Sequence, residues 1–84
     1  MAGTVLLFGR LKDAFGASSI AMPDGVGTAA GLRARLVELN PDLADMLRAQ
    51  TVRIAVNQVM VADEAGTPVS AGDEIALLPP LSGG

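Results

Sequence analysis

The sequence contains no cysteine and no histidine. The lack of cysteine excludes disulfides, a thiol nucleophile and a thiolate ligand for a metal. The lack of histidine removes the side chain that most often acts as a general base near neutral pH or binds a metal. We therefore expect no metal site in this chain, and no catalysis by the chain acting alone.

Aromatic and basic residues are also few. Phe8 and Phe15 are the only aromatic residues, so the chain lacks a set of rings on which nucleic-acid bases stack. Nine acidic residues outnumber six basic ones, and the net charge of −3 disfavours binding to nucleic acid and anionic lipid. No apolar run approaches the ~20 residues of a membrane span, and no basic leader marks a secretion signal. We expect a cytoplasmic protein that binds neither nucleic acid nor membranes.

The first part of the chain predicts two strands. Half of the 84 residues are apolar, which suits one small folded domain. Residues 4–10 are rich in Val, Leu and Phe and predict a buried strand, and a helical turn that stops at Gly16 follows. The sequence SSIAM then predicts a second strand, antiparallel to the first, which ends at the turn of residues 23–25.

The middle of the chain predicts a helical region over residues 28–49. Thr28 is the expected N-cap, and leucines follow at helical spacing. Arg33, Arg35 and Glu38 are expected to be turned away from these leucines. Asn40 is expected to cap a second helical segment, with Pro41 at its first position.

Three strands are expected in the last part of the chain. Residues 52–56 and 59–61 predict a hairpin with Asn57 and Gln58 at its tip, because Asn tolerates the positive φ of such turns. Asp73 and Glu74 are expected to form the turn before a closing strand that begins at Glu74. The order strand, strand, helix, strand, short strand, strand is typical of an α+β fold.

The printed sequence closes with EIALLPPLSGG, and this segment is the candidate functional site. Pro79 and Pro80 cannot donate ladder hydrogen bonds, so sheet pairing must stop there and the chain leaves the sheet in a set direction. We expect a domain of residues 1–80 and a flexible tail of residues 81–84. Gly83 and Gly84 lack a Cβ, so a terminal carboxylate there can enter a slot that excludes side chains. An inert, frayed end is the alternative.

A free carboxylate is ionised and is unreactive as an electrophile. It becomes useful when another enzyme activates it, most simply by forming an acyl-adenylate from ATP. The absence of cysteine fits this chemistry, because no thiol on the chain intercepts the activated acyl group.

These residues resemble the small subunit of molybdopterin synthase, the MoaD family of ThiS/MoaD-like sulfur carriers. The shared pattern at residues 72–84 is a Gly-Asp-Glu turn, an apolar strand, Pro-Pro, an apolar residue, Ser or Thr, and Gly-Gly. VNQ at residues 56–58 and VLLFGRLKDAFG near the start also match. The resemblance implies a β-grasp, ubiquitin-like fold, with a mixed sheet of about four to five strands crossed by one main helix.

The resemblance also implies a function as a sulfur carrier. An adenylating enzyme of the ubiquitin-activating type would use ATP to activate Gly84, and a persulfide donor would supply sulfur to give a thiocarboxylate. The tail, with Leu81, Ser82 and Gly83, would insert into a MoaE-like large subunit of molybdopterin synthase. There the sulfur would build the dithiolene of molybdopterin from cyclic pyranopterin monophosphate. No cofactor would be bound by this chain itself.

The resemblance further implies partner-binding residues. Phe8, Leu78 and Leu81 match apolar contact positions of the family, and burial in the core is the alternative for each. Leu77 and Leu78 adjoin in one strand, so they should point to opposite faces. Lys12 matches a basic position that meets acidic groups of the activating enzyme, and a solvated charge is the alternative.

Three other functions remain open. The chain is compatible with a ThiS-like carrier for thiamine or cysteine synthesis, although such chains are usually shorter and lack the Pro-Pro-apolar-Ser/Thr pattern. It is also compatible with a ubiquitin-like modifier, whose Gly84 would form isopeptide bonds to lysines. A plain interaction domain with an inert tail is the third.

Overall fold

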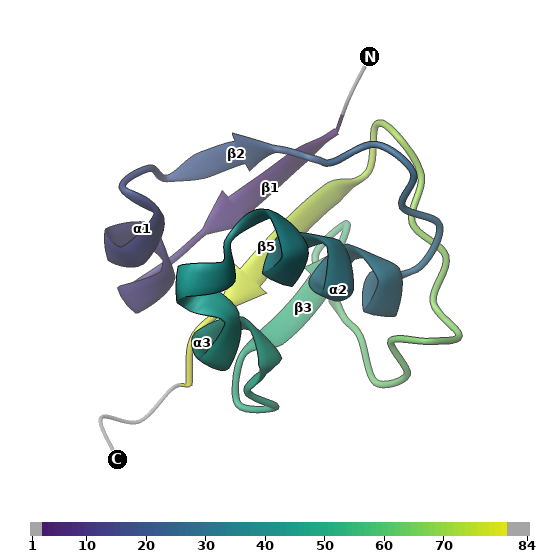
Figure 1. Ribbon diagram of the computed structural model, residues 1–84. Coiled ribbons are helices and arrows are strands. Elements are labelled where there is room, and N and C mark those ends of the chain that lie inside the picture. Colours follow the sequence, from purple (N-terminus) through teal and green to yellow (C-terminus); the bar gives the residue numbers. More distant parts are fainter. Residues whose placement is uncertain (1–2, 81–84) are drawn as a thin grey trace.

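The computed structural model describes residues 3–80 (Figure 1). Two N-terminal residues and the tail, including the predicted Leu81, Ser82, Gly83 and Gly84, lie outside the described residues. The elements, in chain order, are β1 (Thr4–Leu7), α1 (Arg10–Phe15), β2 (Ser19–Ala21), α2 (Ala29–Leu39), the 3-10 helix η1 (Pro41–Leu43), α3 (Ala44–Arg48), β3 (Arg53–Val56), β4 (Val59–Met60) and β5 (Glu74–Leu78).

The five strands form one mixed sheet in the order β2-β1-β5-β3-β4. β1 pairs with β2 in antiparallel fashion, as the sequence predicts, and it pairs with β5 in parallel, with Val5 opposite Ile75. β3 is antiparallel to both β5 and β4. This arrangement confirms the predicted α+β class and the mixed sheet. The closing strand therefore lies in the centre of the sheet, between the first and third strands.

The core lies between one face of the sheet and the helices. Alternation along the strands turns Val5, Leu7, Ile75 and Leu77 to this face, and each is at most 2% exposed. α2 and α3 cover it (Figure 1) and contribute the buried leucines 32, 36 and 47. Burying a side chain of this size contributes about 1.5–3 kcal/mol. The two layers therefore hold β5 firmly up to the residue where the Pro-Pro pair begins.

The helix ends follow the predicted signals in most places. Gly16 ends α1 in a left-handed conformation, with φ 72°, and its N–H donates to the Lys12 carbonyl at 2.9 Å. The Thr28 hydroxyl accepts a hydrogen bond from the Gly31 N–H at 3.0 Å and so caps α2. Within the described residues, no helix has the length and apolar character needed to span a bilayer.

Asn40 occupies the predicted N-cap position of η1, with Pro41 after it, but its side chain acts differently from the prediction. The Asn40 side chain makes no cap bond to the following turn; its Nδ2 instead donates to the Leu36 carbonyl at 3.0 Å and terminates α2. The C-terminal carbonyls of α2 lack partners within the helix, so the amide satisfies one of them. Arg33 lies outside the apolar core, but its side chain is only 16% exposed because it pairs with Glu64, a partner that the sequence did not predict.

The start of β5 is fixed by the β3–β4 hairpin. Asn57 and Gln58 have φ values of 50° and 70°, which confirms the predicted tight tip. The Asn57 amide accepts from the Glu74 N–H at 2.9 Å and donates to an Asp73 carboxylate oxygen at 3.1 Å. The other Asp73 oxygen accepts from the Ser70 N–H at 2.8 Å. Asp73 therefore forms the turn before the last strand, as predicted.

Candidate functional site

The face of the sheet opposite the core carries the candidate partner-binding surface. Residues opposite one another in neighbouring strands share a face, and Leu6, Ala76, Ala55 and Met60 are opposite one another across four strands. Leu78 lies two residues beyond Ala76 and therefore points the same way. We call the surface of the following residues the open face: Leu6, Phe8, Ala55, Met60, Ala76 and Leu78.

Phe8 and Leu78 lie where a partner can reach them. Phe8 follows β1, two residues after Leu6, and is 45% exposed. Leu78 is half-buried, whereas its neighbour Leu77 is 2% exposed and belongs to the core. The predicted alternation at these two leucines is confirmed. Leu77 is therefore a core residue, whereas Phe8 is not. The roles of Phe8 and Leu78 in contacting a partner stay predictions.

Met60 is a residue of the open face that sequence reasoning missed. It is 49% exposed, and the hairpin register brings it opposite Ala55. Val59 is even more exposed, at 68%, but it is opposite Val56 and so points to the other side of the sheet. Pairing the two strands from the Asn57–Gln58 tip would have identified Met60 from sequence, because a two-residue turn sets the register.

Pro79 and Pro80 follow β5 directly, at the end of the sheet where α1 begins. Pro79 packs on Gly9, where an added Cβ would lie 2.9 Å from the Pro79 Cγ. Gly9 also has φ of +55°, which favours glycine. We call the adjoining hollow, of about 210 Å³, the exit hollow, and it is lined by Arg10, Leu11, Met46, Ala49, Thr51, Val52, Pro79 and Pro80. The chain thus leaves the sheet past a fixed contact.

Lys12 lies on α1, close to this exit. α1 begins at Arg10, which lines the exit hollow, and the Lys12 residue is exposed. Its position is compatible with the predicted contact to acidic groups and with the alternative of a solvated charge. Among residues 3–80 the acidic side chains nowhere form a group of three that could bind a metal ion. The predicted site residues of the tail lie outside the described residues.

Residues 5–84 match the ThiS family. The chain belongs to this family. The sulfur carrier subunit of molybdopterin synthase from Dictyostelium discoideum is 32% identical over 82 residues, covering 95% of this chain and 93% of that protein. The sulfur carrier subunit from Haemophilus influenzae is 32% identical over 80 residues, covering 95% and 96%. These matches confirm the resemblance to ThiS/MoaD-like sulfur carriers that the sequence motifs indicated.

Solved structures agree with this assignment. A protein–protein complex of subunits 1 and 2 of the molybdopterin-converting factor from Helicobacter pylori contains a chain that is 30% identical, with a TM-score of 0.68. The small archaeal modifier protein SAMP1 from Haloferax volcanii is 28% identical, with a TM-score of 0.76. Both similarities cover 100% of each chain. They confirm the predicted β-grasp fold.

Proposed function

We propose that this ThiS-family chain is a sulfur carrier for molybdenum cofactor biosynthesis, with Gly84 as its reactive residue. The observation that carries the proposal is the 32% identity to two sulfur carrier subunits of molybdopterin synthase over nearly the whole chain. The family match extends through residue 84 and therefore includes the Gly-Gly pair. In this proposal the chain supplies a sulfur atom and leaves catalysis to its partners.

The reactive group forms in two steps on an activating enzyme. The Gly84 carboxylate attacks ATP, pyrophosphate leaves, and an acyl-adenylate results. The terminal sulfur of a persulfide donor then attacks the acyl carbon and displaces AMP, which gives an acyl disulfide with the donor. A second thiol attacks the donor's sulfur in this disulfide, which releases the thiocarboxylate on Gly84 and leaves the donor as a disulfide with that thiol. Because the chain has no cysteine, no internal thiol competes for the acyl group. The need for ATP supports a cytoplasmic location.

The open face is the proposed docking surface for the large subunit of molybdopterin synthase. β5 contributes Ala76 and Leu78 to this face and continues directly into Pro79. A partner that covers the open face is thereby positioned to receive the tail. Ordering Gly83 and Gly84 in a slot costs about 1–2 kcal/mol each in backbone entropy. Apolar burial at roughly 25 cal/mol per Å² on the open face offsets this cost.

Lys12 is proposed to contact the adenylating enzyme. It is the only lysine of the sequence, it is exposed, and it lies on the helix that borders the exit. A cation there attracts acidic groups around the entrance of the slot that receives the tail. This pairing contributes mainly to the rate and orientation of docking, because exposed ion pairs are worth about 0.2–1 kcal/mol.

Thiol-directed labelling tests the proposal. The protein is incubated with ATP, its adenylating enzyme and a persulfide donor, and it is then treated with a thiol-directed reagent and digested with trypsin. The chain has no basic residue after Arg53, so residues 54–84 form one tryptic peptide. We expect ATP-dependent label on this peptide and nowhere else, because the chain has no cysteine.

A variant that lacks Gly84 is the control. It keeps every residue of the described fold, so it should unfold at the same urea concentration as the parent protein while taking up no label. Full labelling of this variant would refute the assignment of Gly84. Labelling of the parent protein without ATP would contradict the acyl-adenylate.

A ubiquitin-like modifier is the second candidate, favoured by the similarity to the archaeal modifier protein. In that case the activated Gly84 would be taken by lysines of other proteins. Incubation with ATP, the adenylating enzyme and a cell extract distinguishes the two functions. Gly84-linked conjugates of higher mass support the modifier, and label that remains on the free carrier supports sulfur transfer.

A further inference from the structure

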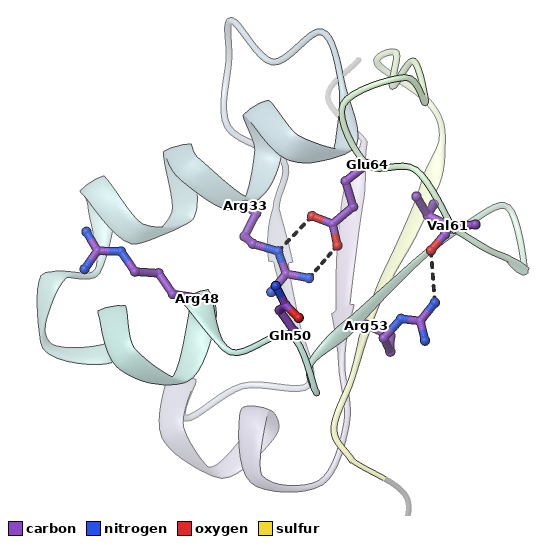
Figure 2. A pocket seen from close by; sticks show the side chains of 7 residues that line it. Arg33, Arg48, Gln50, Arg53, Val61 and Glu64 are labelled. Carbon is purple, nitrogen blue, oxygen red and sulfur yellow. Dashed lines mark hydrogen bonds and ion pairs between the residues drawn. The ribbon is translucent and has the colours of Figure 1, made fainter.

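Basic side chains gather at one hollow on the side of the molecule where α2, the residues after α3 and the loop after β4 meet. The hollow has a volume of about 490 Å³ and contains three of the six basic residues of the sequence (Figure 2). We call it the arginine hollow, and it is lined by Arg33, Arg48, Gln50, Arg53, Val61, Ala62 and Glu64. It shares no lining residue with the exit hollow. This concentration of positive charge stands out in a chain whose net charge is −3.

Arg33 makes the floor of this hollow rigid. Its Nε and Nη2 donate to the two Glu64 carboxylate oxygens at 2.9 and 2.6 Å. Its Nη1 donates to the Leu47 carbonyl at 2.6 Å, and its Nη2 donates to the Val52 carbonyl at 2.6 Å. Arg33 therefore fixes both ends of the segment that carries Arg48 and Gln50. Its own charge is compensated by Glu64.

The other two arginines keep their positive charge uncompensated. Within residues 3–80, neither Arg48 nor Arg53 forms an ion pair. Arg53 donates one hydrogen bond, to the Val61 carbonyl at 3.2 Å, and both residues are exposed. Glu64, which lines this hollow, and Glu38 on α2 are each already paired with another arginine. Glu64 is paired with Arg33, and Glu38 is paired with Arg35 at 3.4 Å.

The shape of the surface favours an extended ligand. Arg48 and Arg53 lie on opposite sides of Gln50 in Figure 2 and do not point at a common centre. A second hollow of about 510 Å³ adjoins the first along α2, where it shares Arg33, Arg48 and Glu64 and adds the apolar side chains of Ala30, Ala34 and Val37. A compact anion would meet one guanidinium, whereas a chain segment can meet both and also place an apolar side chain on α2.

We propose that the arginine hollow binds an acidic segment of a partner protein. Carboxylates of that segment pair with Arg48 and Arg53, and Gln50 hydrogen-bonds the backbone between them. Because the Arg33–Glu64 pair already orders the floor, binding does not have to order that part of the hollow. The site shares no lining residue with the exit hollow, and it adjoins the open face at Arg53, which is opposite Leu78 in the sheet.

Titration with a defined peptide tests this proposal without any sulfur chemistry. The full chain, labelled with ¹⁵N, is titrated with a blocked peptide of sequence Glu-Glu-Leu-Leu-Glu-Glu at low salt, and amide and arginine Nε resonances are followed. We expect saturable shifts at Arg48, Gln50 and Arg53 that weaken as salt is raised, because exposed charges are screened. The same peptide with Gln in place of every Glu should bind at least about tenfold more weakly.

Two variants and one small anion decide the outcome. Arg48→Gln combined with Arg53→Gln should weaken peptide binding by about three- to thirtyfold. Arg10→Gln removes an exposed arginine that lines neither of these two hollows and pairs with none of their carboxylates, and it should leave binding unchanged. Equal losses in both variants would overturn the proposal, as would shifts centred on Arg10 and Lys12. Binding of inorganic phosphate as tight as that of the peptide would contradict an extended ligand.

Discussion

Gly9 and Pro79 are packed so closely that a Cβ on residue 9 would lie 2.9 Å from the Pro79 Cγ. The contact joins the end of β1 to the first residue after β5. It therefore links the parallel strand pair at the centre of the sheet to the point where the chain leaves the fold. A change at residue 9 acts on the position of Pro79 as well as on stability.

Gly9→Ala should destabilise the protein by about 1–3 kcal/mol, because alanine meets both a positive φ and the Pro79 ring. Gly27→Ala is the matched control, since a Cβ there meets nothing within 4 Å. Urea unfolding of the two variants measures the difference. Equal stability of both variants would show that the Gly9–Pro79 contact is unimportant.

Arg33→Lys should destabilise the protein by about 1.5–3 kcal/mol, because an ammonium group cannot make the forked bond to Glu64 and also reach the three backbone carbonyls that Arg33 contacts. Arg35→Lys is the control. Arg35 forms only an exposed ion pair with Glu38, so this substitution should change the free energy of unfolding by less than about 0.5 kcal/mol. Thermal or urea unfolding measures both changes. A loss in Arg33→Lys no larger than that in the control would contradict the structural role of Arg33.

Asp73 should make stability depend on pH in the acid range. The Ser70 N–H and the Asn57 amide donate to its carboxylate, and these bonds hold the pKa of Asp73 below its ordinary value of 3.8. The ionised group therefore stabilises the fold above that ordinary pKa, and this contribution is lost as pH falls through the lower folded pKa.

Asp73→Asn isolates this effect, because the amide has only one acceptor oxygen for the two donors. We expect the variant to unfold at lower urea concentration than the parent protein near pH 7, and the gap to shrink as pH is lowered to about 2. A gap that is constant over this range would mean that Asp73 does not titrate with unfolding.

Phe8→Ala should weaken binding to the large subunit of molybdopterin synthase by about 1–2 kcal/mol, or about five- to thirtyfold, because an exposed ring of the open face is lost. Val59→Ala is the control, since Val59 is more exposed but lies on the opposite side of the sheet. Calorimetric titration measures both affinities. A larger loss of affinity in Val59→Ala than in Phe8→Ala would show that the large subunit does not bind the open face.

Local signals were sufficient to predict most of the fold. The Thr28 cap, the Gly16 stop and the Asn57–Gln58 tip each depend on residues close in sequence, and all three are present. The parallel pairing of β1 with β5 was not predicted, because it joins the two ends of the domain and leaves no mark in either segment.

The candidate site was predicted unevenly for the same reason. Phe8, Leu78 and the Pro-Pro pair follow from a motif that is contiguous in sequence or from a family position. Met60 is assigned to the open face only when the register of β3 and β4 is known. The pairing of Arg33 with Glu64 joins α2 to a loop that is distant in sequence. An arginine on a helix looks solvent-exposed from sequence when its partner lies in another element.

Sulfur transfer to the pterin is the most direct test of the proposed sulfur-carrier function. The carrier is first converted to its thiocarboxylate, and it is then mixed with cyclic pyranopterin monophosphate and the large subunit of molybdopterin synthase. We expect that dithiolene forms and that two thiocarboxylates return to carboxylate for each dithiolene, since each carrier delivers one sulfur. A thiocarboxylate that stays intact with the large subunit but is consumed by thiazole synthase would contradict this function and identify a carrier for thiamine synthesis.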